Sequence, residues 1–442
     1  MSALWTAAEI AAATGGNVAG DWAATGVSID TRTLAPGDLF VALTARRDGH
    51  DFVADALARG AAGALVARVV EGCEPSRLCV VADTQEGLEA LGAASRARTA
   101  ARVVGITGSV GKTGTKAALA HGLARLGATH ASVESYNNHW GVPLSLAQMP
   151  PDVAFGVFEM GMNRAGEISR LTRQVRPEAA IVTAIAPAHL EFFEDESGIA
   201  RAKAEIFEGV APGSVAVVVG DSPHTKLLVE RARACGIERI VTFGEGGDVA
   251  AEHVTADATG SDVSARLEGG TVRYRIGLAG AHWVKNSLAL LATVEAMALD
   301  VDAFAASLAD LAPEPGRGRA LEIQVAGGTA TVIDDSYNAN PASMRAALEV
   351  LALAPGRKLA ALGAMKELGP TARALHAELA GPVQAADVAL VFTAGAEMTA
   401  LADALPAERH AAHGEDAAAL LEPVRAALRP DDTLLVKGSL AS

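Results

Sequence analysis

Residues 103–113 read Val103-Val104-Gly105-Ile106-Thr107-Gly108-Ser109-Val110-Gly111-Lys112-Thr113, and this stretch decides the fold. A β-branched run leads into a loop around Gly108, Ser109 and Gly111, and a helical pattern follows from Lys112. In a strand, loop and helix of this kind, the backbone N–H groups and the helix N-terminus bind phosphate. Lys112 would reach the β- and γ-phosphates, and the Thr113 hydroxyl would hold Mg²⁺. The sequence therefore predicts that the chain binds ATP or GTP.

The loop departs from the usual spacing, which places a glycine five residues before Gly111. That position is Ile106, and the glycine stands one place earlier, at Gly105. The alternative is a glycine-rich turn with a chance Gly-Lys-Thr. The strand and the helix fall where a phosphate loop needs them, which favours a variant phosphate loop.

The bulk properties limit the class of protein. A chain of 442 residues is expected to form about three domains. Half of the residues are hydrophobic but only 4% are aromatic, which is typical of Val- and Ala-rich parallel sheets covered by helices. The net charge of −15 argues against a nucleic-acid-binding protein. Scattered cysteines, no leader and no apolar span predict a cytoplasmic protein without membrane insertion, and we expect a monomer.

The pattern divides the chain into residues 1–100, 101–312 and 313–442, with a proline-rich boundary near residues 310–316. The first region is expected to hold helices over 6–14 and 86–98 and strands over 27–33, 38–43 and 78–82. Strands of the second are expected at 154–158, 180–185, 215–219 and 239–243, with an antiparallel insert near 244–277 and a helix over 286–298. Strands of the third are expected at 331–333, 359–362, 388–392 and 433–436. The predicted fold class is α/β with three domains: a central parallel-sheet domain with the phosphate loop and a C-terminal Rossmann-like domain.

Several polar residues follow predicted strands, where open α/β sheets bind ligands. Glu159 closes one strand and is suited to Mg²⁺, although a solvated acid would look the same. His189 follows the next strand, as a ligand or as a structural histidine. Lys203 lies on a predicted helix, where an exposed lysine is the default. Residues 334–341 could hold ribose or phosphate, or form a turn with Asx caps.

Together these motifs resemble the Mur ligases of peptidoglycan synthesis, in family order and over almost the whole chain. The motifs are residues 107–113, Glu159-Met160-Gly161, His189-Leu190, residues 202–207, Asn286 and residues 334–341. Residues 30–43, 335–340 and 366–369 resemble the members that use ATP to join D-alanyl-D-alanine to UDP-N-acetylmuramoyl-tripeptide through an acyl phosphate. The resemblance implies an N-terminal domain for the uridine nucleotide, a central domain for ATP, and a C-terminal domain for ATP and D-alanyl-D-alanine.

The resemblance also implies roles for single residues. It places ATP on the phosphate loop and on His282, Asn286, Arg317 and Asp335. It makes Thr113, Glu159, His189 and Lys203 ligands of Mg²⁺, with Lys203 carbamylated by CO₂, and Lys112, Glu159, His189 and Lys203 catalytic. It places the UDP-muramoyl-peptide on Ser28, Arg32, Asn137 and Asn138.

Two departures and several alternatives remain. Trp283 stands where many relatives carry asparagine, and the chain stops before a last helix that relatives usually have. The general base for the incoming amine is not identified, and His376 is one candidate. A sister ligase that adds a diamino acid, a folyl-polyglutamate synthetase and a phosphate-loop switch protein are the alternative functions. The missing diamino-acid motif disfavours the sister ligase. The order of Glu159, His189 and Lys203 disfavours the switch protein.

Overall fold

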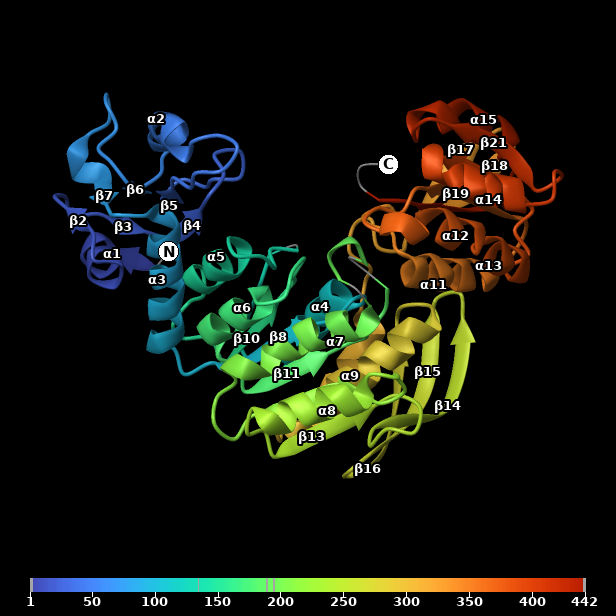
Figure 1. The fold of residues 1–442 in the computed structure, drawn as a ribbon, viewed down its shortest axis with the longest axis horizontal. Helices are drawn as coiled ribbons and strands as arrows, with labels where there is room; N and C mark the ends of the chain where they lie inside the picture. The colour runs from blue at the N-terminus through green and yellow to red at the C-terminus, as the bar shows by residue number, and fades with distance from the viewer. Residues whose placement is uncertain (1–2, 134, 188–189, 194, 440–442) are drawn as a thin grey trace.

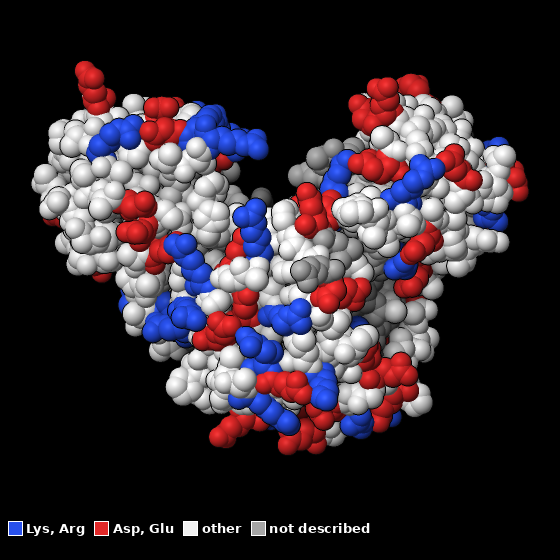
Figure 2. Space-filling model, viewed as in Figure 1, with Lys and Arg blue, Asp and Glu red and all other residues white. Residues whose placement is uncertain are grey.

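The computed structural model describes residues 3–133, 135–187, 190–193 and 195–439, and each predicted region contains a sheet of its own (Figure 1). The N-terminal and C-terminal regions stand on either side of the central one. In the space-filling view they rise on the two sides of a deep hollow, and charges of both signs are mixed on this face (Figure 2). The predicted α/β fold class is confirmed. The domain boundaries at residues 100 and 312 stay a prediction.

The N-terminal region is a five-stranded sheet in the order β2-β7-β6-β5-β4, in which only β2 runs antiparallel to its neighbour. Its strands are β2 (Asn17–Val18), β4 (Gly26–Ser28), β5 (Asp38–Val41), β6 (Gly63–Val66) and β7 (Leu78–Val80), with a separate pair β1 (Trp5–Thr6) and β3 (Ala23–Ala24). Its helices are α1 (Ala7–Thr14), α2 (Val53–Ala58) and α3 (Thr84–Arg98). Thr6 caps α1 in a capping box with Glu9.

The central region is a fully parallel six-stranded sheet in the order β13-β12-β11-β8-β10-β9. The strands are β8 (Arg102–Thr107), β9 (Thr129–Ala131), β10 (Phe155–Glu159), β11 (Ala179–Val182), β12 (Val215–Val219) and β13 (Arg239–Phe243). The helices are α4 (Lys112–Leu123), α5 (Gly141–Ala147), α6 (Glu167–Val175), α7 (Glu196–Ala204), α8 (Thr225–Ala234), α9 (Ala281–Ala296) and α10 (Val301–Ser307). Strand β8 lies inside this sheet, between β11 and β10, so the phosphate loop follows a buried central strand.

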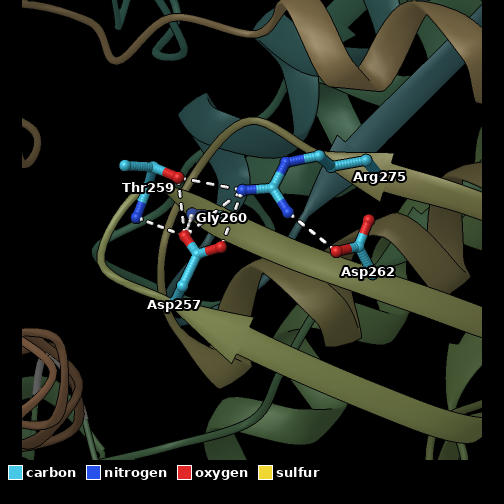
Figure 3. Close-up of polar contacts among 5 residues, drawn as sticks. All are labelled: Asp257, Thr259, Gly260, Asp262 and Arg275. Carbon is cyan, nitrogen blue, oxygen red and sulfur yellow. Dashed lines mark hydrogen bonds and ion pairs between the residues drawn. The ribbon is translucent and has the colours of Figure 1, made fainter.

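The predicted antiparallel insert is present as β14 (Ala250–Asp257), β15 (Gly260–Leu267) and β16 (Gly270–Ile276). The turn between β14 and β15 is held by Asp257, which accepts from Thr259 N at 2.7 Å and Gly260 N at 2.9 Å (Figure 3). Arg275 of β16 bridges Asp257 and Asp262, each at 2.9 Å. Hydrogen bonds from Thr259 and Arg275 lower the pKa of Asp257. This cluster explains the turn without any ligand.

The C-terminal region is a six-stranded sheet in the order β17-β18-β22-β19-β20-β21, parallel except for the β17–β18 hairpin. The strands are β17 (Arg319–Val325), β18 (Gly328–Asp334), β19 (Lys358–Gly363), β20 (Leu390–Ala394), β21 (His410–Gly414) and β22 (Thr433–Lys437). The helices are α11 (Pro341–Ala352), α12 (Ala372–Ala377), α13 (Ala380–Ala385), α14 (Thr399–Ala404) and α15 (Leu421–Ala427).

The predicted elements differ from the structure at several places. The strand predicted over 27–33 ends at Ser28, because the Asp30 side chain accepts from Arg32 N at 2.9 Å and turns the chain. Strands β6 (Gly63–Val66) and β9 (Thr129–Ala131) were not predicted. Helix α9 begins at Ala281 rather than at residue 286, after Gly280 with φ of 113°. The earlier start brings His282 and Trp283 onto the helix.

Candidate functional site

The phosphate loop lies between β8 and α4 and is fixed by the end of the neighbouring strand β11. Ser109 N donates to Ala184 O at 2.8 Å, and Thr183 Oγ1 donates to Val110 O at 2.6 Å. A Cβ at Gly108 would overlap the hydroxyl oxygen of Thr183, so glycine is needed there. Gly111 has a φ of 83° immediately before α4. The helix N-terminus therefore opens onto the loop, as phosphate binding requires.

Lys112 lies at the start of α4 with its side chain folded toward the loop. Its Nζ donates to Gly108 O at 2.8 Å. Burial lowers the pKa of Lys112, Glu159 opposes that shift, and Arg317 adds to it. A cation, a carboxylate and a guanidinium from three separate elements thus lie within electrostatic reach of one another.

Glu159 ends β10 and is 1% exposed. Its Oε1 accepts from Asn137 Nδ2 at 2.7 Å, and Oε2 has no hydrogen-bond partner among the described residues. A buried carboxylate oxygen without a donor is costly unless a cation binds it. The resemblance assigns Asn137 to the UDP-muramoyl-peptide, but in the structure its side-chain amide is hydrogen-bonded to Glu159.

Lys203 is on α7, fully buried, and its Nζ has no hydrogen-bond partner in the described part of the chain. Burial lowers its pKa well below the ordinary value, and the charge of Lys112 lowers it further. Glu159, Glu205 and Glu167 oppose the shift. The exposed-lysine alternative is therefore wrong, and the amine is held in a state that favours the neutral form.

The predicted metal ligands are brought together in part. Thr113 is buried, with its Oγ1 3.4 Å from Ser135 Oγ, and the charge of Glu159 opposes the lowering of the Lys203 pKa. His189 lies outside the described residues. No group of three His, Cys, Asp or Glu side chains within the described ranges could hold a metal ion. The free Glu159 oxygen fits Mg²⁺, but Lys203 fits it only if the amine gains oxygen atoms.

The C-terminal region reaches the phosphate loop through Arg317. Its Nη2 donates to Ser135 Oγ at 3.3 Å, and its guanidinium lies 4.1 Å from the centre of the Tyr337 ring. Gly316, with a φ of 70°, turns the chain before Arg317 and accepts from Tyr337 N at 3.0 Å. No sequence motif pointed to Ser135.

Asp335 follows β18 and pairs with a lysine that sequence reasoning missed. Lys437 Nζ lies 2.7 Å from Asp335 Oδ2, and the lysine side chain is 2% exposed. Asp334 and Asn340 instead serve the turn, since Asp334 accepts from Ser336 N at 3.2 Å and Asn340 caps α11. The turn with Asx caps is therefore present at Asp334 and Asn340, and ribose or phosphate binding by Asp335 stays a prediction. The signal in the sequence for Lys437 was its position at the end of a largely apolar run of Thr, Leu and Val, where a lysine side chain is unlike a typical exposed one.

The first turns of α9 lie between the loop and the C-terminal region. A Cβ at Gly111 would lie 3.1 Å from Asn286 Oδ1, and one at Gly114 would lie 2.8 Å from the Trp283 ring, so both side chains contact α4. Burial lowers the pKa of His282 to about 4, with a smaller effect from Lys437. His282 and Asn286 are thus beside the predicted nucleotide site.

The predicted UDP-muramoyl-peptide residues lie at the junction of the first two regions. Ser28 is buried and donates to Asp30 O at 3.0 Å. The Arg32 side chain is 81% exposed and pairs with Asp30, which lowers the pKa of that carboxyl group. Asn138 accepts from Gly141 N at 2.9 Å at the start of α5. Ser28 and Asn138 therefore have structural partners, while Arg32 and Asn138 are both exposed to solvent.

His376 is wrong as a general base. It is fully buried, its Nδ1 donates to Ala372 O at 2.6 Å, and its Nε2 accepts from Met365 N at 2.9 Å. Both ring nitrogens are occupied by backbone groups, so the imidazole supports the turn after β19 rather than taking a proton from a substrate.

Two family models match the chain: the Mur ligase middle domain over residues 106–294 and the Mur ligase glutamate ligase domain over residues 318–440. The chain belongs to the Mur ligase family. This confirms the predicted resemblance and the prediction of an ATP-dependent ligase, and it excludes a phosphate-loop switch protein. Within the described residues, no helix has both the length and the apolar character needed to span a membrane.

Relatives of this Mur ligase align over most of its length. The UDP-N-acetylmuramoyl-tripeptide–D-alanyl-D-alanine ligase of Escherichia coli (strain K12) is 35% identical over 93% of this chain and 90% of its own. The crystal structure of MurF from Acinetobacter baumannii has a TM-score of 0.86 and 32% identity, covering 98% of this chain and 96% of that one. MurF from Thermotoga maritima in complex with ADP has a TM-score of 0.79 and 27% identity, covering 94% of both chains.

Proposed function

We propose that this Mur ligase uses ATP to join D-alanyl-D-alanine to UDP-N-acetylmuramoyl-tripeptide, giving UDP-N-acetylmuramoyl-pentapeptide, ADP and phosphate. The observation that carries the proposal is the buried pair of Glu159 and Lys203 beside the phosphate loop, each with one polar atom that has no partner in the described residues. The relatives that align over nine-tenths of the chain bear this activity in their names. The structure of one of them contains ADP.

The reaction needs two steps because a free carboxylate has no good leaving group. The tripeptide carboxylate attacks the γ-phosphate of ATP, releasing ADP and forming an acyl phosphate. The amine of D-alanyl-D-alanine then attacks the acyl carbon, phosphate leaves, and the amine loses a proton. Positioning and charge stabilisation account for most catalysis of phosphoryl transfer.

The residues of the loop and its surroundings would carry this positioning. The N–H groups at residues 108–113 and the Lys112 ammonium would hold the β- and γ-phosphates, and Arg317 would approach them from the C-terminal region. Asp335 would accept from a ribose hydroxyl, while Asn286 and His282 would line the base. Arg32 and Asn138 would contact the UDP-muramoyl-peptide, with Ser28 beneath them.

Mg²⁺ would be held by Thr113, Glu159 and a modified Lys203, together with His189, and would neutralise phosphate charge. We propose that the Lys203 amine attacks CO₂, forms a C–N bond and loses a proton, which yields a carbamate anion. The burial and low pKa of Lys203 support this, because only the neutral amine is a nucleophile. Asn137 would orient Glu159 rather than contact the substrate.

We further propose three domains with boundaries near residues 100 and 312, and a cytoplasmic monomer. Three separate sheets support the division. The cysteines Cys73, Cys79 and Cys235 are all free, which agrees with a reducing compartment. Sedimentation at micromolar concentration tests the monomer, and a stable dimer would contradict it.

A phosphate-release assay tests the reaction. Wild-type enzyme is supplied with ATP, UDP-N-acetylmuramoyl-tripeptide and D-alanyl-D-alanine, each omitted in turn, and the product mass is measured. Phosphate release that depends on all three, with a pentapeptide product, is expected. Release with a diamino acid and a UDP-muramoyl-dipeptide instead would identify the sister ligase, and release that needs neither organic substrate would refute ligation.

A further inference from the structure

Lys437 ends β22, and its side chain contacts the turn between β18 and α11. The Lys437 side chain is 2% exposed, and its Nζ lies 2.7 Å from Asp335 Oδ2. The same Nζ donates to Asn338 O at 2.9 Å and to Asp335 O at 3.4 Å. An ammonium group has three donors, so Lys437 directs all of them to the turn between β18 and α11.

Burial and the surrounding charges distinguish the Lys437–Asp335 pair from an ordinary surface ion pair. Burial raises the pKa of Asp335 above its usual value; Lys437 and, less strongly, Arg317 oppose this rise, and Asp334 adds to it. Burial likewise lowers the pKa of Lys437, and Asp335 opposes that change. His282 of α9 also lies within electrostatic reach of the Lys437 ammonium. Burial therefore favours the neutral form of both groups, and each partner of the pair reduces that effect on the other.

We propose that Lys437 is a positioning residue for the nucleotide, which fixes the Asp335 carboxylate through Oδ2 so that Oδ1 accepts a hydrogen bond from a ribose hydroxyl. The inference rests on the proposed function, in which Asp335 holds the ribose. Lys437 itself contacts the turn and not the nucleotide. Its effect is therefore expected on recognition of the sugar rather than on the chemical step.

A purely structural role is the alternative, and the same strand provides a matched control. Asp432 immediately precedes β22, is 3% exposed at its side chain, and pairs with Arg357 at 2.6 Å. Arg357 Nε donates to the second oxygen of Asp432 at 2.9 Å. Arg357→Met thus removes a cation from a buried carboxylate at the opposite end of β22, away from the β18–α11 turn.

The test compares wild type, Lys437→Met and Arg357→Met with ATP, 2′-deoxy-ATP and 3′-deoxy-ATP in the phosphate-release assay between pH 6 and 9. We expect wild type to discriminate against the analogue that lacks the bonded hydroxyl. Lys437→Met should raise the KM for ATP at least tenfold and change kcat less than threefold. Its KM values for ATP and for the discriminated deoxy analogue should differ less than twofold. Its KM should rise further as the pH falls, because Asp335 without Lys437 takes up a proton at higher pH. Arg357→Met should lower the melting temperature and keep the sugar discrimination.

Unchanged discrimination and an unchanged pH profile in folded Lys437→Met would overturn the inference, as would the same loss in Arg357→Met. If Lys437→Met does not fold, Lys437→Arg replaces it: the larger planar group displaces Asp335 but keeps the charge, so discrimination should fall without a new pH dependence. Wild-type discrimination in that variant would also overturn the inference. Failure of the proposed function is distinguishable, because wild type would then form no pentapeptide with ATP.

Discussion

Asn137→Ala separates two roles for one side chain, metal positioning and substrate contact. Asn137 Nδ2 donates to Glu159 Oε1 at 2.7 Å, and Glu159 Oε2 has no partner within the described residues, so the substitution leaves both carboxylate oxygens buried and unpaired. A hydrogen bond to a charged group contributes about 1.5–3 kcal/mol. Since about 1.4 kcal/mol is a tenfold change, the Mg²⁺ concentration for half-maximal rate should rise roughly 10- to 100-fold, a range typical of residues that orient metal ligands.

The assay is a Mg²⁺ titration of phosphate release at saturating ATP, repeated as a titration of UDP-N-acetylmuramoyl-tripeptide at saturating Mg²⁺. Asn138→Ala is the control, because Asn138 is adjacent in sequence but exposed and bonded to Gly141 N. Asn138→Ala should leave the Mg²⁺ requirement unchanged. An Asn137→Ala enzyme with a normal Mg²⁺ requirement and a raised KM for the UDP-muramoyl-peptide would refute the reasoning and restore the substrate contact.

Three further outcomes are expected. Lys112→Ala removes the cation at the helix N-terminus, so kcat should fall at least about 100-fold with little change in melting temperature by calorimetry; near-normal ligation would contradict its role. Lys203→Ala should be almost inactive in phosphate release and partly rescued by acetate or formate, and full activity without rescue would exclude the carbamate. Burial lowers the pKa of His282 from 6.5 to about 4, so the unfolded chain protonates this imidazole at a higher pH than the folded protein does. The free energy of unfolding should therefore fall as the pH drops from 6.5 to about 4. This loss is at most about 3 kcal/mol. Urea unfolding of His282→Gln between pH 7 and 4 should not show it. If the free energy of unfolding of His282→Gln falls with pH as steeply as that of wild type, other groups cause the loss.

The sequence predicted most of the central sheet because β8, β10, β11 and β12 are runs of largely buried residues. The strands at 215–219 and 239–243 match β12 and β13 at both ends. The strand predicted over 27–33 failed because the Asp30 side chain bonds to Arg32 N, a local contact that periodicity does not reveal. Strand β6 was missed because Gly63–Val66 is only four residues long, all buried, without alternation.

Site residues could be predicted where their type and order along the chain indicate their role. They were harder to predict where the role depends on burial or on a partner from another element. The residues of the phosphate loop and Glu159 come directly from strand ends. Lys203 looks like a surface residue until the helix is seen to be buried, and His376 looks available until its backbone partners are known. Lys437 was missed because its partner Asp335 is about a hundred residues away, and only the fold brings them together.

The order of strands in the C-terminal sheet also bears on how the protein is made. Strand β22 comes last of the sheet's strands in the chain, yet it lies in the middle, paired with β18 on one side and β19 on the other. During synthesis, domains generally fold in order from the N-terminus. The first two regions can fold while the ribosome is still working, whereas the third must wait with two open strand edges until residues 433–437 emerge. A transcript cut short before Thr433 would therefore yield a protein with an intact phosphate loop but a divided last sheet, exposed to proteases and to edge-to-edge aggregation.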